Sequence, residues 1–282
     1  MTGSQTGFGP TGISVEAGQP GAAYLGDTPL LRTHAGTQPD LFLCWNAIPR
    51  DAAAIDVAVH LHGFSRQGGA MPLAEKVARS GLDLSRRARP TLALLPRGNW
   101  LRYSWYDFPA LLGGGLDRLV DYALDRFAAV RSASSPARLR ADRLILTAHS
   151  GGGMPAIDAI TDAERAPDEL HVFDGLYGRD PATGDPMRGL DTLERWLDQR
   201  LAMEPQRQGA LRVLYLERQT GPFSREVGRS IARRLAAFDP DVAAQLGRRY
   251  RVEPVPVPHA QIAQYCGPDL LAAANMDFDW SS

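Results

Sequence analysis

The chain has 282 residues, of which 44% are hydrophobic and 22% are charged, values that are ordinary for a soluble globular protein. The length allows one large α/β domain or two small ones. A formal net charge of −1 gives no global attraction to nucleic acid or to an anionic membrane. No apolar run approaches the ~18 residues that a membrane span requires.

Residues 1–28 are rich in Gly, Thr and Ser, and lack the basic start and apolar core of an export signal. We expect them to form a flexible lead-in, with residues 29–282 as a single domain. We expect a cytoplasmic protein, with an exported chain whose signal has been removed as the alternative.

Short apolar runs recur along the chain and predict strands, because a buried parallel strand is typically a continuous apolar block. Residues 41–45 predict an antiparallel strand that leads into the sheet. The later runs lie at 57–61, 91–95, 143–148, 171–173, 211–216 and 250–257. Prolines at 254, 256 and 258 place the last strand at or near a sheet edge, because proline cannot donate to a ladder.

Between these runs, apolar residues recur at helical spacing over 116–127, 190–201 and 227–238. Strands that alternate with helices predict an α/β fold with a mostly parallel central sheet and helices on both faces. No internal repeat or low-complexity linker divides the sequence, which favours one domain.

The most informative stretch is an apolar strand, Leu144 to Ala148, that leads to Ser150 and three glycines. Glycines mark sharp turns or very close packing, so the Ser150 hydroxyl is expected on a tight strand-to-helix turn above the sheet edge. The pattern resembles the nucleophile elbow of the α/β-hydrolase superfamily, with Ala148 in place of the usual first glycine. The resemblance covers roughly residues 55–265 and implies the α/β-hydrolase fold and a lipase-like serine esterase. A serine N-cap in an ordinary loop is the alternative interpretation.

The predicted strand 57–61 runs into His62-Gly63-Phe64-Ser65, which resembles the His-Gly motif of many α/β-hydrolases. The resemblance implies an oxyanion hole made by the backbone amides of Phe64 and Gly151. An ordinary glycine-containing turn is the alternative.

An acyl-transfer serine also needs a base and a group that orients the base. Among the six histidines, His259 alone follows the last predicted strand, where members of the family place their base. Asp174 ends the strand 171–173 and precedes a glycine, so its carboxylate is expected at the same sheet edge. Glu217, after the next strand, is the alternative acid, although its neighbour Arg218 also suits a surface ion pair. We favour Asp174 as the acid. The three residues together predict a Ser-His-Asp triad that cleaves a carboxylic ester by two-step acyl transfer.

An aromatic segment follows the second strand of the parallel series and is expected to overhang the pocket. Its predicted substrate-binding residues are Trp100, Tyr103, Trp105, Tyr106 and Phe108. A loop that fills space between helices is the alternative, and glycines 113–115 suit either a lid hinge or a loop end. We expect a small-molecule or acyl-ester substrate and no nucleic-acid partner.

Two other classes of protein remain open. A metal-dependent hydrolase would use the His60-x-His62 pair, with His149 and Asp174 as further ligands. A non-catalytic binding protein on the same fold would not need a complete triad, which this chain offers. We expect no metal and no cofactor. Cys44 and Cys266 have no metal-type spacing, and one bridge between them stays open.

Overall fold

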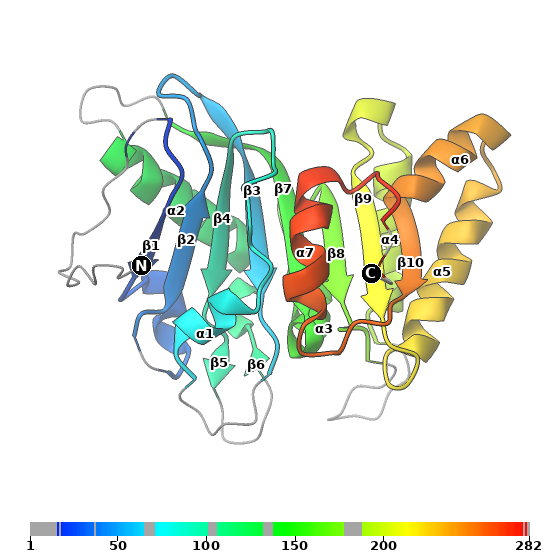
Figure 1. The fold of residues 1–282 in the computed structure, drawn as a ribbon, viewed down its shortest axis with the longest axis horizontal. Helices are drawn as coiled ribbons and strands as arrows, with labels where there is room; N and C mark the ends of the chain where they lie inside the picture. The colour runs from blue at the N-terminus through cyan, green and yellow to red at the C-terminus, as the bar shows by residue number, and fades with distance from the viewer. Residues whose placement is uncertain are drawn as a thin grey trace.

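The computed structural model describes residue 16, residues 18–36, 38–64, 71–100, 106–131, 138–177 and 188–278, and residue 280. Within these residues, eight strands form one sheet in the order β1-β2-β4-β3-β7-β8-β9-β10 (Figure 1). The strands are β1 (Gly21–Leu25), β2 (Leu41–Trp45), β3 (Ala54–Leu61), β4 (Thr91–Pro96), β7 (Arg140–His149), β8 (Glu169–Phe173), β9 (Ala210–Tyr215) and β10 (Tyr250–Pro254). A separate short ribbon joins β5 (Asn99–Trp100) to β6 (Tyr106–Asp107).

The sheet is parallel from β4 to β10 and antiparallel only at β1 and β2. Residues 41–45 pair antiparallel with β4, and β10 is the last strand of the sheet, as the sequence predicts. The central strand β3 pairs Val57 with Leu92 of β4 on one side and with Leu144 of β7 on the other. All three side chains are buried, which explains why these strands read as continuous apolar runs.

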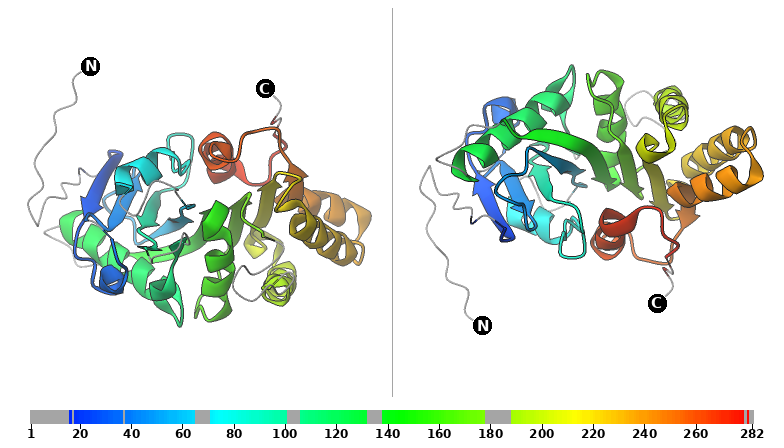
Figure 2. Two further views of the ribbon diagram at one scale, coloured as in Figure 1. Left: turned by 90° about the horizontal axis from the view of Figure 1, so that it is seen from below. Right: turned by 90° about the horizontal axis from the view of Figure 1, so that it is seen from above.

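Helices cover both faces of this sheet (Figure 2). One face carries α1 (Leu73–Ala78) and α7 (Ile262–Ala273). The other carries α2 (Gly115–Arg131), α3 (Gly153–Thr161) and α4 (Leu190–Leu201), while α5 (Gly221–Leu235) and α6 (Pro240–Arg249) lie at the β10 end. Short 3-10 turns are η1 (Pro29–Thr33), η2 (Pro109–Leu111), η3 (Ser150–Gly152) and η4 (Pro205–Arg207). The predicted fold class, a mostly parallel sheet with helices on both faces, is confirmed.

The apolar stripes of the helices form the core against the sheet. The stripe of α2 is buried along its length, at Leu116, Leu119, Val120, Ala123, Leu124 and Phe127. These residues belong to the same buried cluster as the inward-facing residues of β3 and β7. Helical spacing therefore identified the buried face of α2 correctly.

The structure differs from the predicted flexible lead-in over residues 1–28. Residues 1–15 lie outside the described part of the chain, but Gly21–Leu25 form β1, which pairs in register with β2. Ala23 and Leu25 are buried in this pairing, but a five-residue strand that begins with a glycine and two alanines gives a weaker signal than the branched apolar runs of the central strands. At the other end, β10 stops at Pro254 rather than at residue 257, because the prolines that follow cannot donate to the ladder.

The parallel arrangement brings the carboxyl ends of β3, β7, β8 and β10 to one edge of the sheet (Figure 1). The segments that leave these ends carry Gly63, Ser150, Asp174 and His259, respectively. Both cysteines are free thiols; Cys266 is buried in α7 and Cys44 lies in β2. Among the described helices, none has the length and apolar character needed to cross a membrane.

Candidate active site

Ser150 lies on the sharp turn from β7 into η3 and α3. Its φ of 51° is in the left-handed region, which costs a non-glycine residue free energy and is typical of strained functional turns. Close packing around the turn holds this backbone in place. A Cβ added at Gly152 would lie 2.2 Å from the carbonyl oxygen of Leu61, so only glycine lets the turn approach the end of β3.

Three side chains from distant parts of the chain meet at this turn. The Ser150 Oγ lies 2.8 Å from Nε2 of His259, and Nδ1 of His259 lies 2.5 Å from Oδ2 of Asp174. Ser150 and Asp174 are buried, whereas the imidazole of His259 is 43% exposed. The structure thus brings together the three residues that the sequence predicts as a triad.

The Asp174 carboxylate is held by several donors besides His259. Its Oδ1 accepts hydrogen bonds from the Thr220 hydroxyl and, at 2.9 Å, from the Leu216 amide. Burial alone would raise the pKa of Asp174, but the bonds from His259, Thr220 and Leu216 outweigh it and lower the pKa below its usual range. Asp174 therefore stays ionised beside the histidine over the ordinary pH range.

Glu217, the alternative acid, does not reach His259. It forms an ion pair with Arg225 of α5 and accepts a hydrogen bond from the Tyr215 hydroxyl at 3.2 Å. Its side chain is 59% exposed. The surface ion pair that the sequence suggests for Glu217 is present, but with Arg225 rather than with Arg218.

The segment after β3 lies directly against the Ser150 turn. A Cβ added at Gly63 would lie 2.8 Å from the Ser150 Cβ, and one added at Gly151 would lie 3.5 Å from the backbone nitrogen of Phe64. The amides of Phe64 and Gly151 are therefore neighbours beside the serine.

The mostly parallel sheet, the helices on both of its faces and the strained serine turn after β7 are the features of one known fold. The chain has the α/β-hydrolase fold.

No family model and no curated protein sequence matches the chain. Among solved structures, it is similar to an α/β serine hydrolase without lid from Xanthomonas campestris, at 14% identity and a TM-score of 0.41, over 93% of this chain and 96% of that one. It is also similar to a siderophore hydrolase from Aspergillus nidulans, at 14% identity and a TM-score of 0.48, over 95% and 99% of the two chains. An S-formylglutathione hydrolase from Agrobacterium tumefaciens matches at 13% identity and a TM-score of 0.49, over 93% and 96%.

Two further side chains contact the three residues, and sequence reasoning missed both. The Tyr177 hydroxyl lies 3.0 Å from the Ser150 Oγ. The Nε2 of His149 lies 2.8 Å from the backbone oxygen of His259, and the two imidazole rings lie 5.0 Å apart. Burial, and then the neighbouring His259, lower the pKa of His149 to about 4, so a neutral His149 donates its Nε2 proton to that carbonyl. Tyr177 follows Asp174 by three residues, which is the one signal in the sequence for its position.

The predicted aromatic wall is only partly within the described residues. Trp100 and Tyr106 contribute backbone to the ribbon β5–β6, while Tyr103 and Trp105 lie outside the described residues. Phe108 differs from the prediction, since it is 2% exposed and its ring lies 5.3 Å from that of His62 in the core. It fills space between elements, as the alternative interpretation of this segment holds.

Both histidines of the His60-x-His62 pair form hydrogen bonds inside the protein. Nδ1 of His60 lies 2.8 Å from the Thr147 hydroxyl, and burial lowers the pKa of His60 to about 3. His62 contacts the Gly63 oxygen through Nδ1 at 3.1 Å and accepts from the Gly98 amide through Nε2 at 3.0 Å. Across the described residues, no group of three or more His, Cys, Asp and Glu side chains is placed to hold a metal ion.

Proposed function

We propose that this protein is a serine hydrolase that cleaves carboxylic esters by two-step acyl transfer. The observation that carries the proposal is the continuous chain of contacts from Asp174 through His259 to the Ser150 Oγ, at 2.5 and 2.8 Å. These distances are within the reach that proton transfer between a base and a nucleophile requires.

In the first step, Ser150 attacks the ester carbonyl while its proton passes to Nε2 of His259. Asp174 accepts the Nδ1 proton of the imidazole, which keeps Nε2 free as the base and stabilises the imidazolium. His259 then gives the proton to the leaving alkoxide, and an acyl-enzyme remains on Ser150. Water repeats the sequence, with His259 again as base, and releases the carboxylic acid.

The negative charge that develops on the carbonyl oxygen needs donors fixed before the reaction. The amides of Phe64 and Gly151 are the proposed donors, and the close packing of Gly63 against Ser150 supports this placement. Removing one such donor in a related kind of site costs about 10²- to 10³-fold in kcat. A rigid hole is therefore a large part of the proposed rate enhancement.

The test measures hydrolysis of p-nitrophenyl esters of increasing acyl length, together with labelling by a fluorophosphonate. We expect turnover and labelling by the natural protein, and loss of about 10⁶-fold in kcat with loss of labelling in Ser150→Ala. Ser85→Ala is the matched control, because Ser85 is an exposed serine outside the proposed site, and this variant should keep full activity.

Three outcomes would contradict the proposal. Equal turnover by the natural protein and Ser150→Ala would place the chemistry elsewhere. Activity that EDTA removes and zinc restores would favour the metal-dependent alternative. An absence of any turnover and labelling would favour a binding protein on this fold.

A further inference from the structure

The sole lysine of the chain, Lys76, is buried beside the proposed oxyanion site. It lies in α1, and its side chain reaches the segment that leaves β3. The Nζ of Lys76 donates a hydrogen bond of 2.6 Å to the carbonyl oxygen of Gly63. A buried ammonium is costly unless it is well bonded, so this contact is a specific one.

A second donor reaches the same carbonyl. His62 accepts the Gly98 amide at Nε2, so its proton lies on Nδ1, which points to the Gly63 oxygen at 3.1 Å. Burial, and then the charge of Lys76, lower the pKa of His62 well below its usual value and keep the ring neutral. The Gly63 carbonyl thus accepts one charged and one neutral hydrogen bond.

This carbonyl belongs to the peptide group whose nitrogen is that of Phe64. A peptide group is planar and conjugated, so donors on its oxygen fix its plane and draw electron density from its N–H. Hydrogen bonds in series strengthen one another in this way, by about 10–30% per bond. The two donors on Gly63 therefore act on the Phe64 amide, the proposed oxyanion donor.

We propose that Lys76 is a positioning residue of the oxyanion hole, which orients and polarises the Gly63–Phe64 peptide toward the developing oxyanion. This inference rests on the proposed function and adds to it. Lys76 acts through the peptide and does not itself contact the substrate.

The protonation of Lys76 gives the inference a pH signature. Burial, and then Arg79 and Arg97, lower the pKa of Lys76 to about 7, with Glu75 opposing the shift. His62 and His149 also face this ammonium. Because the neutral amine is a weaker donor, the benefit from Lys76 is greatest well below its pKa of about 7 and declines as the pH rises through that value.

The experiment compares Lys76→Met with the natural protein on p-nitrophenyl butanoate and on its thionoester, which has sulfur in place of the carbonyl oxygen. Sulfur accepts hydrogen bonds weakly, so the thionoester gains little from an oxyanion hole. We expect Lys76→Met to lose about tenfold in kcat/KM on the ester, less than removal of a whole donor costs, and much less on the thionoester. The ester-to-thionoester ratio falls, and the difference between the two proteins on the ester narrows above pH about 7.

Arg79→Met is the matched control, since it removes a positive charge from an exposed position at the end of the same helix. At pH 6 it should keep the rates and the ratio of the natural protein. Active sites are counted by fluorophosphonate titration. If Lys76→Met folds poorly, Lys76→Arg is the second variant; it keeps the positive charge and should keep part of the ester-to-thionoester ratio.

The outcomes separate this inference from the proposed function. Equal losses on ester and thionoester, with no change of the pH profile, would reduce Lys76 to a structural residue while leaving Ser150 as the nucleophile. Full turnover by Ser150→Ala would overturn the proposed function, and the Lys76 inference with it.

Discussion

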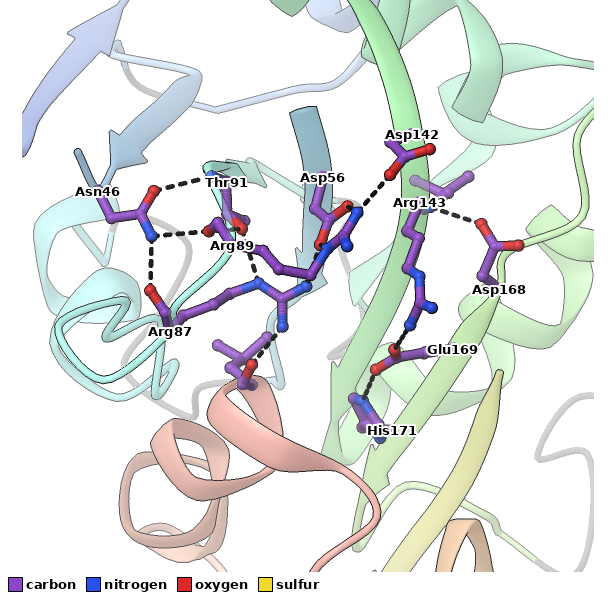
Figure 3. A network of polar contacts seen from close by, with 12 residues as sticks. Asn46, Asp56, Arg87, Arg89, Thr91, Asp142, Arg143, Asp168, Glu169 and His171 are labelled. Carbon is purple, nitrogen blue, oxygen red and sulfur yellow. Dashed lines mark hydrogen bonds and ion pairs between the residues drawn. The ribbon is translucent and has the colours of Figure 1, made fainter. Parts of the chain in front are cut away.

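The two ends of the sheet both carry dense polar networks, but they are built differently. At the amino ends of the parallel strands, Asp56 is fully buried and pairs with Arg87 at 2.5 Å and with Arg89 at 2.8 Å (Figure 3). Arg89 also pairs with Asp142 of β7. Further along the same edge, Glu169 bridges Arg143 and His171. Positive and negative groups are interleaved there, and the network binds neighbouring strands together.

At the carboxyl ends, the polar groups form a chain with a direction. Asp174 is saturated with donors, His259 has one nitrogen on Asp174 and one on Ser150, and the chain ends at a hydroxyl. Both Ser150 and Asp174 have a positive φ, and among the amino-end residues named above none has one. Strain together with a one-way chain of hydrogen bonds distinguishes the proposed active site from the ion-pair network at the amino ends.

A hollow of about 650 Å³ also opens at the amino end, lined by arginines and acids that include Arg165, Asp168 and Arg200. Asp168 accepts from Arg200 at 2.8 Å and from the Leu144 amide at 2.8 Å. These side chains are engaged with one another, so this hollow belongs with the structural network and not with the chemistry.

Substitutions test this comparison between the two ends of the sheet, and the largest expected effect is the loss of kcat when the proposed triad acid is changed. Asp174→Asn should lower kcat for p-nitrophenyl esters by about 10⁴-fold, because the amide favours the wrong imidazole tautomer. Glu217→Gln, the matched control, should change kcat by less than about twofold, since the side chain of Glu217 is exposed and pairs with Arg225 rather than with His259. The reverse pattern would make Glu217 the acid and would contradict the assignment from geometry.

The next effect concerns the amino end and stability alone. Asp56→Asn leaves the buried Arg87 and its neighbour Arg89 without their shared carboxylate, so the free energy of unfolding should fall by about 3 kcal/mol. Asp142→Asn, at a half-exposed partner of Arg89, should cost less than about 1 kcal/mol. Urea unfolding measures both, and kcat per titrated active site should stay unchanged. A large loss of kcat in Asp56→Asn would show that the two ends are coupled.

The smallest expected effect concerns Tyr177. Since the serine proton points to His259, the Tyr177 hydroxyl donates to the Ser150 oxygen and helps to hold its rotamer. Tyr177→Phe should therefore lower kcat/KM and the rate of fluorophosphonate labelling by about fivefold, as expected for one hydrogen bond of about 1 kcal/mol. Tyr122→Phe, on α2, is the control. A faster rate in Tyr177→Phe would instead show that the hydroxyl restrains the nucleophile.

Much of the fold could be predicted from the chain because buried parallel strands leave an unmistakable apolar pattern. The runs at 57–61, 91–95 and 143–148 became β3, β4 and β7, with longer ends. The edge strand β1 was not found in this way, since it is short, only partly buried, and made of a glycine and two alanines before Tyr24 and Leu25. The ribbon β5–β6 is too short to leave any pattern.

The residues around Ser150 likewise fall into two groups, those that the sequence pattern indicated and those that it did not. Ser150, Asp174 and His259 follow the ends of strands, so strand order indicated where each would lie. Tyr177 and Lys76 carry no such mark, because a tyrosine in a loop and a lysine in a short helix are ordinary in sequence. Phe108 was misread for the same reason: an aromatic residue beside a predicted pocket looks the same whether it lines the pocket or fills the core.

The sequence by itself determined the order of the parallel strands and their main helices, and the residue types at each strand end, because burial and turn geometry are encoded locally. It left open which acid contacts His259, since Asp174 and Glu217 follow adjacent strands and both preserve the chain order. Only the tertiary structure decided this, by placing Asp174 at 2.5 Å from the imidazole and Glu217 against Arg225. Contacts between residues about 85 positions apart depend on packing of the whole sheet, and no local pattern specifies them.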